Sequence, residues 1–476
     1  MDLVPFKGSK SVYSHDVQLF SMPGTNLAFH EKRFVIHTPV SDTLSPVEFV
    51  IPASDQFIDL NRSYFKAKVR IRKANNTNIA NTELGLFPTI NGIHSMIKKF
   101  TARWNGTLLN PMADSYADQA YLSTLFDYSS REAGTLLATE GWWPPDLETG
   151  LAPIDPPAEL TINKLTTNAV AGVGADHANF AALKTSEKAF VRGMVRAREK
   201  IKGGKWTHYS FKPMHEIFYS QRILPPGVEQ KYMFELQNAN FYLNGADAAG
   251  VKNPHKDDFK FEFHVVTVRL NPLLYRAISS ARHTRRLNVK ITTSRTEIRN
   301  FTLPANIVDF NEGNLWQGRI PQRMVVGLRH PDCVNGNLLR YPYAFEKFGL
   351  ISMKQLIKGE EYPYRELVLN QGDGDIDDDG YFRLLQAGGF KRKVLEPMVT
   401  PEMWGHQHQC TLFVFDNTAG SLTDGPSLNP RQHGDARLIF KLGANVNHAI
   451  NITLYAQFEN VITIDPNGAV LYDVYT

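Results

Sequence analysis

Two groups of residues have types and spacings that suit metal binding. Asp375, Asp377 and Asp379 precede Gly380 in a D-x-D-x-D-G pattern. In calcium loops of this kind, alternating carboxylates and a tight turn surround a hard cation. The twelfth position holds Gln386, where such loops place a bidentate Glu. A solvated acidic loop is therefore the alternative interpretation.

The second group is His406, His408 and Cys410, which alternate along HQHQC. Alternate side chains of a strand share one face, so the three could bind zinc or copper. The alternative is a chance arrangement at the start of the apolar run after Cys410. The only other cysteine is Cys333, so a four-cysteine zinc site and a disulfide framework are excluded. We expect no cofactor.

Two basic clusters are candidate contacts for DNA, a scaffold protein or another acidic partner. Residues 188–205 carry seven basic side chains and one acidic one, and a shorter cluster follows at 282–286. Solvated faces or internal salt networks are the alternative. The residues considered for such contacts are Arg192, Arg196, Arg198, Lys200, Lys202, Arg282, Arg285 and Arg286.

Composition and missing motifs argue against an enzyme. The chain of 476 residues has 52 basic and 48 acidic side chains, too small a surplus to indicate nucleic-acid binding alone. It lacks the G-x-S-x-G, H-E-x-x-H, P-loop and Rossmann patterns.

No window approaches 18 consecutive apolar residues, and no signal peptide is evident at the N-terminus, so we expect neither a transmembrane helix nor secretion.

Strand-like segments must position these residues. The run Phe259–Leu270 alternates aromatic and polar side chains, as in a strand with one buried face. About a dozen such runs, rich in aromatic and β-branched residues, predict sandwiches or barrels. The best helical pattern is Ser115–Phe126, with Leu122 and Phe126 four residues apart.

A weak internal repeat indicates that one sandwich occurs twice. Four segments of the first half have counterparts in the same order in the second half. The pairs are 100–111 with 351–363, 121–126 with 381–386, 228–236 with 434–442, and 261–270 with 451–464. Chance similarity between amphipathic strands is the alternative. Duplication accounts for both the length and the order of the segments.

Long insertions and an N-terminal arm complete this organisation. Residues 134–205 and 358–403 have the composition of loops, and long loops in compact domains are usually functional or partner-bound. Residues 1–45 are expected to form an extended arm. Trp142 and Trp143 in the first insertion could anchor a subunit interface, or could cap their own sandwich.

An ordered series of segments resembles hexon-type major capsid proteins, which contain a double jelly roll. The resemblance includes hexons of adomaviruses and adintoviruses, and uncharacterised invertebrate relatives associated with Maverick/Polinton-type elements. It spans most of residues 46–465. The segments that carry it are IPASDQFIDLNRSYFKAKVRI (51–71), WNGTLLNP (104–111), YADQAYLSTLFDY (116–128), PQRMVVGL (321–328) and LYAQFENVITID (454–465).

The resemblance implies an all-β chain of two tandem eight-stranded jelly rolls with long loop insertions and few short helices. The first would occupy 46–275 and the second 276–476, including a C-terminal tail. It further implies a structural, non-enzymatic hexon of a DNA virus, assembling as a homotrimer into pseudo-hexagonal capsomers of an icosahedral shell. Neighbouring capsomers, penton and minor capsid proteins would be its partners. The chain would be made in the host cytoplasm and reside in the virion capsid, with assembly in the nucleus as one option.

Two other functions remain open from the sequence. Tandem jelly rolls also build glycan-processing and copper-dependent enzymes, which would need a carboxylate pair or a metal triad between the sandwiches. A receptor-binding or minor vertex protein is the second alternative, distinguished from a hexon by its copy number in the particle.

Overall fold

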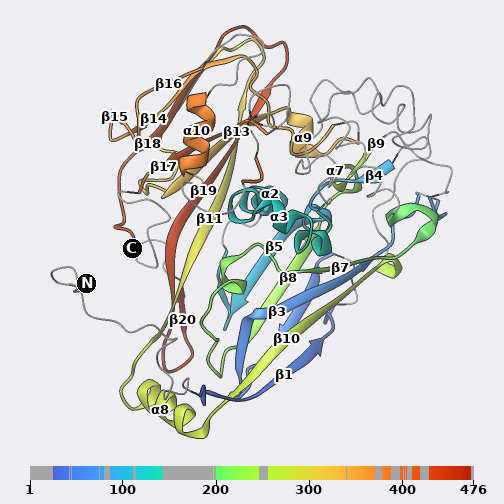
Figure 1. Ribbon diagram of the computed structural model, residues 1–476, viewed down its shortest axis with the longest axis vertical. Helices are drawn as coiled ribbons and strands as arrows, with labels where there is room; N and C mark the ends of the chain where they lie inside the picture. Colours follow the sequence, from blue (N-terminus) through green and yellow to red (C-terminus); the bar gives the residue numbers. More distant parts are fainter. Residues whose placement is uncertain are drawn as a thin grey trace, which may run out of the picture.

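The structure is a computed structural model in which two β-sandwiches dominate, one from each half of the chain (Figure 1). It describes residues 25–472 except 42, 44, 74, 80–85, 111–113, 143–196, 198–199, 246–255, 339, 370–377, 388–396, 400, 402–403, 405–409 and 419–427. The predicted all-β class and the presence of two sandwiches are confirmed.

The first sandwich has two four-stranded sheets, ordered β1-β10-β3-β7 and β2-β8-β5-β6. Every pair in them is antiparallel. The strands are β1 (Phe29–His37), β2 (Val47–Ile51), β3 (Phe57–Val69), β5 (Ile97–Trp104), β6 (Thr107–Leu108), β7 (Thr207–Phe211), β8 (Gln230–Leu236) and β10 (Phe259–Leu270), with a separate small ladder of β4 (Leu86–Pro88) and β9 (Leu243–Gly245).

Aromatic side chains fill the space between these two sheets. Phe65 of β3 stacks on Phe263 of β10 with ring centroids 4.0 Å apart. It meets Phe234 of β8, in the opposite sheet, edge-on at 5.0 Å. Burying large rings supplies most of the driving force for such a core. The alternating pattern of the sequence therefore specifies which face of each strand is inside.

The second sandwich has sheets ordered β11-β19-β13-β17 and β12-β18-β14-β15. Two short strands extend them, because β20 pairs with β19 and β16 pairs with β14. The strands are β11 (Val289–Leu303), β12 (Asp309–Glu312), β13 (Arg323–Arg329), β14 (Leu350–Ile357), β15 (Glu360–Glu361), β16 (Leu367–Val368), β17 (Leu412–Asp416), β18 (Ala436–Leu442), β19 (Ile450–Ile464) and β20 (Val470–Tyr472).

The two sandwiches have the same topology. When the eight principal strands of each are numbered along the chain, both have one sheet ordered 1-8-3-6 and another ordered 2-7-4-5. This is the jelly-roll arrangement. The predicted repeat pairs fall on equivalent elements: β5–β6 with β14–β15, α2 with α10, β8 with β18, and β10 with β19. The double jelly roll is confirmed.

Short helices connect the strands. They are α1 (Gly92–Ser95), α2 (Tyr116–Asp127), α3 (Ser130–Ala133), α7 (Ala239–Tyr242), α8 (Pro272–His283), α9 (Pro331–Asn335) and α10 (Asp378–Ala387), with 3₁₀ turns η2 (Leu137–Glu140), η4 (Lys202–Gly204), η5 (Glu216–Phe218) and η6 (Lys256–Asp258). Within the described residues no helix is long and apolar enough to span a membrane.

The structure revises three boundaries. The expected arm, 1–45, contains β1, which is ordered by pairing with β10 of the same chain. Helix α8 spans the expected domain boundary at 275/276, so a helix joins the sandwiches. The insertion expected at 358–403 includes β15 and β16, which pair with β14.

Helix α2 lies between the two sandwiches (Figure 1) and contributes to both cores. Ten of its twelve residues are buried. Tyr116 and Ala120 belong to the core of the first sandwich, whereas Leu122 and Leu125 belong to the core of the second. Tyr121 stacks on Tyr343 of the second half, with ring centroids 4.1 Å apart. A helix buried on both sides couples the two sandwiches mechanically.

One buried ion pair fixes α2 against the second sandwich. Arg329 of β13 is fully buried and donates two hydrogen bonds to Asp118 of α2, at 2.8 and 2.7 Å. Its guanidinium also donates to the carbonyl of Pro342 at 2.9 Å. Bidentate geometry sets both the distance and the orientation of the two elements.

We predict that Asp118→Asn lowers the free energy of unfolding by about 3 kcal/mol, because it leaves the buried Arg329 without its counter-charge. Urea unfolding monitored by intrinsic fluorescence measures the change. Asp114→Asn is the matched control, since Asp114 pairs with Lys99 but its side chain is 80% exposed. An exposed pair contributes less than about 1 kcal/mol. Equal losses in the two variants would contradict the assigned role of the buried pair.

Candidate functional site

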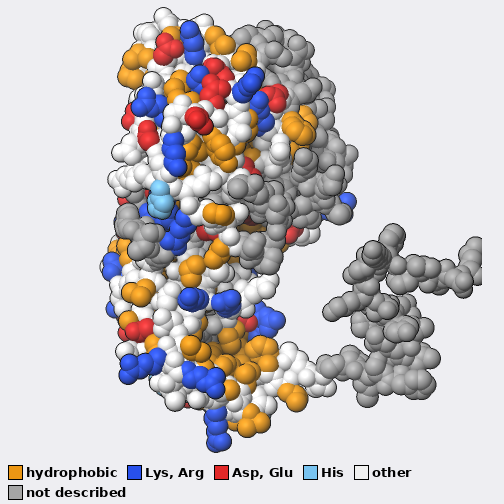
Figure 2. Space-filling model, turned by 90° about the vertical axis from the view of Figure 1, so that its left-hand side faces the viewer, with side chains coloured by type: hydrophobic (Ala, Val, Ile, Leu, Met, Phe, Trp, Pro, Cys, Tyr) orange, Lys and Arg blue, Asp and Glu red, His pale blue; other side chains and the backbone are white. Residues whose placement is uncertain are grey.

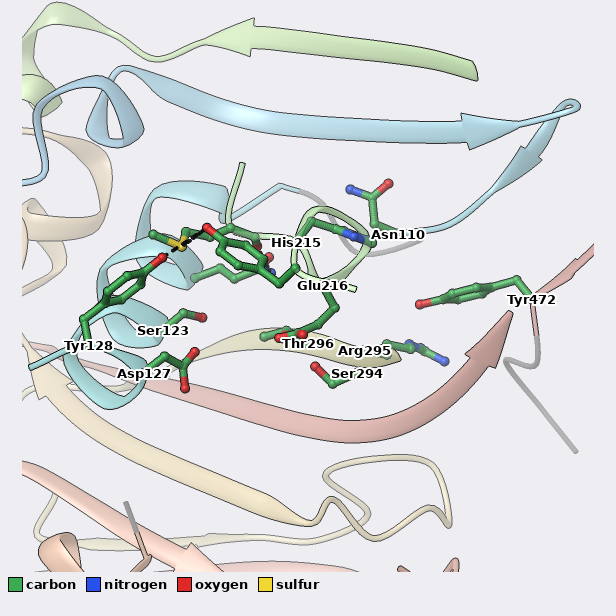
Figure 3. Close-up of a pocket in the computed structure, with 13 residues that line it drawn as sticks. Asn110, Ser123, Asp127, Tyr128, His215, Glu216, Ser294, Arg295, Thr296 and Tyr472 are labelled. Atoms are coloured by element: carbon green, nitrogen blue, oxygen red, sulfur yellow. Dashed lines mark hydrogen bonds between the residues drawn. The ribbon is translucent and has the colours of Figure 1, made fainter. Parts of the chain in front are cut away.

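A cavity of about 380 Å³ lies where the two sandwiches meet (Figure 3). Helix α2 and residues 214–219 of the first half form one side, and β11 and the end of β20 in the second half form the other. The lining residues are Asn110, Gln119, Ser123, Asp127, Tyr128, Met214, His215, Glu216, Tyr219, Ser294, Arg295, Thr296 and Tyr472.

A tight turn presents Glu216 to this cavity. His215 begins the 3₁₀ turn η5, and its Nδ1 accepts a hydrogen bond from the Ile217 amide at 3.4 Å. Ile217 and Phe218 are buried in the first core. Because its neighbours face the core, Glu216 extends toward β11, as Figure 3 shows.

Burial dominates the electrostatics of this turn. Burial, with a smaller contribution from the nearby Asp127 carboxylate, raises the pKa of Glu216 to about 7, although Ser294 and Arg323 oppose the shift. Burial lowers the pKa of His215 to about 4, so this imidazole is neutral at pH 7. The turn therefore carries one carboxyl group that titrates near neutrality and one histidine that does not.

Two ion pairs border the cavity. Arg323 of β13 lies 3.7 Å from Asp127, whose side chain is 49% exposed and so lies near the surface. Arg295 of β11 pairs with Glu297 on the same strand, and both are buried. Each of these cations thus has a carboxylate partner within the chain.

Three hydrogen-bonded polar side chains beside the cavity are of the types found in catalytic relays. They are buried, however, so a substrate cannot reach them. His94 contacts the Tyr116 hydroxyl at 2.8 Å through Nδ1 and Glu140 at 3.3 Å through Nε2. All three residues are buried, and burial raises the pKa of Tyr116 far above its usual value. The Tyr116 hydroxyl also accepts from the Met214 amide at 3.0 Å. These bonds hold α1, α2 and η2 together.

Only one residue of each predicted metal site lies within the described part of the chain. Asp375, Asp377, His406 and His408 lie outside the described residues. Asp379 is exposed on α10 and pairs with Arg383 at 2.7 Å. Cys410 is fully buried in the second core. Within the described part of the chain, no three His, Cys, Asp or Glu residues are grouped as metal ligands.

The basic clusters are only partly described. Arg192, Arg196 and Arg198 and the side chain of Lys202 lie outside the described residues, whereas Lys200 is exposed. Arg282 is a correction: it is buried at the end of α8 and donates to the carbonyls of Pro226 and Asp465, both at 3.3 Å. These two hydrogen bonds link the first half of the chain to the second. The side chains of Arg285 and Arg286 are exposed.

Trp142 is a second correction. It is 1% exposed in the single chain and lies 5.9 Å from Tyr121, ring centroid to centroid, in the second core. It is therefore part of its own chain's core, as the alternative interpretation has it. Trp143 lies outside the described residues.

The sequence interpretation did not assign the cavity. His215 and Glu216 stand adjacent in a short turn-forming segment, and no second histidine at helical spacing marks them as a motif. Apart from their neighbours Met214 and Tyr219, the other side chains come from positions more than 70 residues away, such as Asp127 and Ser294. Only the packing of one sandwich against the other brings them together.

Exposed apolar side chains mark a different surface. Strand β1 is the outer strand of its sheet, and Phe29, Phe34, Val35 and Ile36 are between 39% and 60% exposed. Helix α8 exposes Leu273, Leu274 and Tyr275. Figure 2 shows hydrophobic side chains gathered on the lower part of one face, at the end of the molecule where α8 lies in Figure 1. Exposed apolar patches and hydrophobic edge strands usually mark contact surfaces.

Comparisons with solved structures identify the fold. The chain is similar to a structure of the Sputnik virophage, with a TM-score of 0.54 and 11% identity over 98% of this chain and 94% of that one. It is also similar to PBCV-1 VP54 fitted into a Sputnik reconstruction, with a TM-score of 0.53 and 10% identity over 96% and 100% of the two chains. A model of the PBCV-1 virus capsid gives the same values.

Sequence comparison adds one distant relative. An uncharacterised protein of Caenorhabditis elegans, F54H12.2, is 21% identical over 361 residues, which cover 73% of this chain and 75% of the relative. No family model matches the chain. At these identities the solved structures establish a double jelly-roll fold.

Glu216 makes stability depend on pH. Its pKa is about 7 in the folded chain and about 4.5 when solvated, so the folded state holds the proton more tightly. The contribution of Glu216 to the free energy of unfolding is fully present below pH 4.5 and is lost as the pH rises through 7. The free energy of unfolding therefore falls by about 2 kcal/mol between pH 5 and pH 8. We predict that Glu216→Gln removes this decline, measured by urea unfolding over that range. The control is Glu360→Gln, at an exposed position of β15. A decline of the same size in the Glu216 variant would contradict the assignment.

Proposed function

We propose that the chain is the structural subunit of a viral-type shell, a hexon-like major capsid protein that assembles as a homotrimer. The repeated jelly-roll topology carries the proposal, since both halves have sheets ordered 1-8-3-6 and 2-7-4-5. The solved relatives with this fold include a model titled as the PBCV-1 capsid and a structure of the Sputnik virophage. The first of these is a capsid, and we infer the same role for this chain.

The architecture suits shell building. Each chain provides two rigid sandwiches, so three chains place six around one axis and form a pseudo-hexagonal block that tiles an icosahedral surface. In each half, most of the long insertion falls between the fifth and sixth strands of the jelly roll. Loops at that end of a sandwich can lengthen without disturbing the core.

Strand β1 is the contact that we assign to the trimer. Its outer edge has no strand partner among the described residues, and its burial pattern has no fully buried position. Phe34 and Ile36 are 60% and 57% exposed. Covering such an edge removes apolar surface from water and satisfies backbone groups, which is the usual basis of a stable interface.

A structural role also agrees with the chemistry of the described residues. They include no grouped metal ligands, and the His94–Glu140 contact is shielded from substrate by burial. Neighbouring capsomers, penton and minor capsid proteins are the proposed partners, in a virion capsid assembled from chains made in the host cell. The exposed Arg285 and Arg286 are proposed contacts for an acidic partner such as DNA or a scaffold protein.

We predict that the purified protein is a trimer by size-exclusion chromatography with light scattering at micromolar concentration. Phe34→Ser combined with Ile36→Ser should convert it to a folded monomer, because the contact loses its apolar surface. Val368→Ser is the control, since this residue is 67% exposed on the short strand β16. A stable monomer for the unmodified protein would refute the proposed assembly.

A further inference from the structure

We propose that the cavity between the two sandwiches binds a primary aliphatic ammonium ion, with Glu216 as its counter-charge. The cavity measures about 380 Å³, within the range of small-molecule sites. Its walls come from both halves of the chain, so an occupant would contact both sandwiches (Figure 3). The inference does not depend on the proposed shell function.

Most polar groups of the wall are already satisfied. Gln119 donates to the Met214 carbonyl at 3.0 Å, and Ser123 contacts the Tyr455 hydroxyl at 3.1 Å. The Asn110 side chain bonds the backbone of β5. His215 accepts from Ile217 through Nδ1 and is neutral. None of these groups requires a ligand.

Two groups remain for an occupant. The buried Ser294 hydroxyl lies close enough to Glu216 to favour its ionised form, but makes no hydrogen bond of normal geometry within the described residues. Glu216 has no Lys or Arg within ion-pair distance in that part of the chain, whereas Asp127 and Glu297 are paired with Arg323 and Arg295. A half-buried carboxylate without an ion-pair partner of its own favours a cation.

The net charge of the cavity wall also favours a cation. Of the residues that line the cavity, Asp127, Glu216 and Arg295 are the charged ones, and His215 is neutral. This leaves one negative charge when Glu216 is ionised, while the nearby phenols of Tyr128 and Tyr219 stay neutral because burial raises their pKa values. A monovalent cation would neutralise the cavity.

The wall favours an organic cation over a metal ion. Tyr128, Tyr219 and Tyr472 line the cavity, and aromatic rings attract ammonium groups. The chain already shows this contact, since the Lys212 Nζ lies 5.6 Å from the centroid of the Tyr219 ring. Metal ions instead require several grouped ligands, and the described residues offer no such group. An alkyl chain would pack on the rings while its ammonium donates to Glu216 and Ser294.

Isothermal titration calorimetry of the full chain with the monoamine n-butylamine at pH 8 tests the proposal. The carboxyl of Glu216 is then largely ionised and the amine largely protonated. We expect saturable binding of one molecule per chain. Binding should weaken at least tenfold at pH 5.5, where Glu216 is protonated. The neutral isostere 1-butanol should not bind.

Glu216→Gln should also weaken binding at least tenfold. The amide imitates the protonated carboxyl that the folded chain accepts, and a thermal melt checks that the variant is folded. Glu360→Gln should bind like the unmodified chain, because Glu360 is exposed on β15. Equal binding of the alcohol, undiminished binding by the Glu216→Gln variant, or no saturable heat at pH 8 would each overturn the proposal.

Discussion

The two sandwiches hold together through a helix that is buried on both sides. Helix α2 inserts side chains into both cores, and the buried pair between its Asp118 and Arg329 of β13 fixes its orientation. Breaking such a pair exposes an uncompensated charge to a low dielectric, which is far more costly than losing a surface pair. The arrangement of one jelly roll against the other therefore depends on this contact, and so does any assembly that needs the two as one rigid unit.

The cavity is a consequence of that packing. Helix α2 holds Asp127 and Tyr128 opposite β11 of the second sandwich, and the turn at Glu216 closes the space between them. A movement of one sandwich relative to the other would change the surroundings of Glu216. The same junction thus provides rigidity through Arg329 and a titratable carboxyl through Glu216.

Much of the fold could be predicted from the sequence. Alternating aromatic residues, as in β10, specify a strand with one buried face, and the repeat placed β5–β6, α2, β8 and β10 in correspondence with their counterparts. The repeated order reflects duplicated topology, which leaves a pattern along the chain. The edge strand β1 was expected to lie in an extended arm, because exposed residues on both of its faces leave no alternating signal.

The sites were less predictable, because the local spacing of residues in the sequence does not show which side chains become buried or which distant residues come into contact. Tryptophan and arginine are residue types that favour interfaces. Trp142 nevertheless packs against Tyr121, and Arg282 donates to the carbonyls of Pro226 and Asp465, so both are buried within the chain.

The most direct test of the shell-building account is electron microscopy of the purified protein. The account predicts three-fold particles of pseudo-hexagonal outline with six sandwich-sized densities. Single two-lobed particles at all concentrations would contradict it.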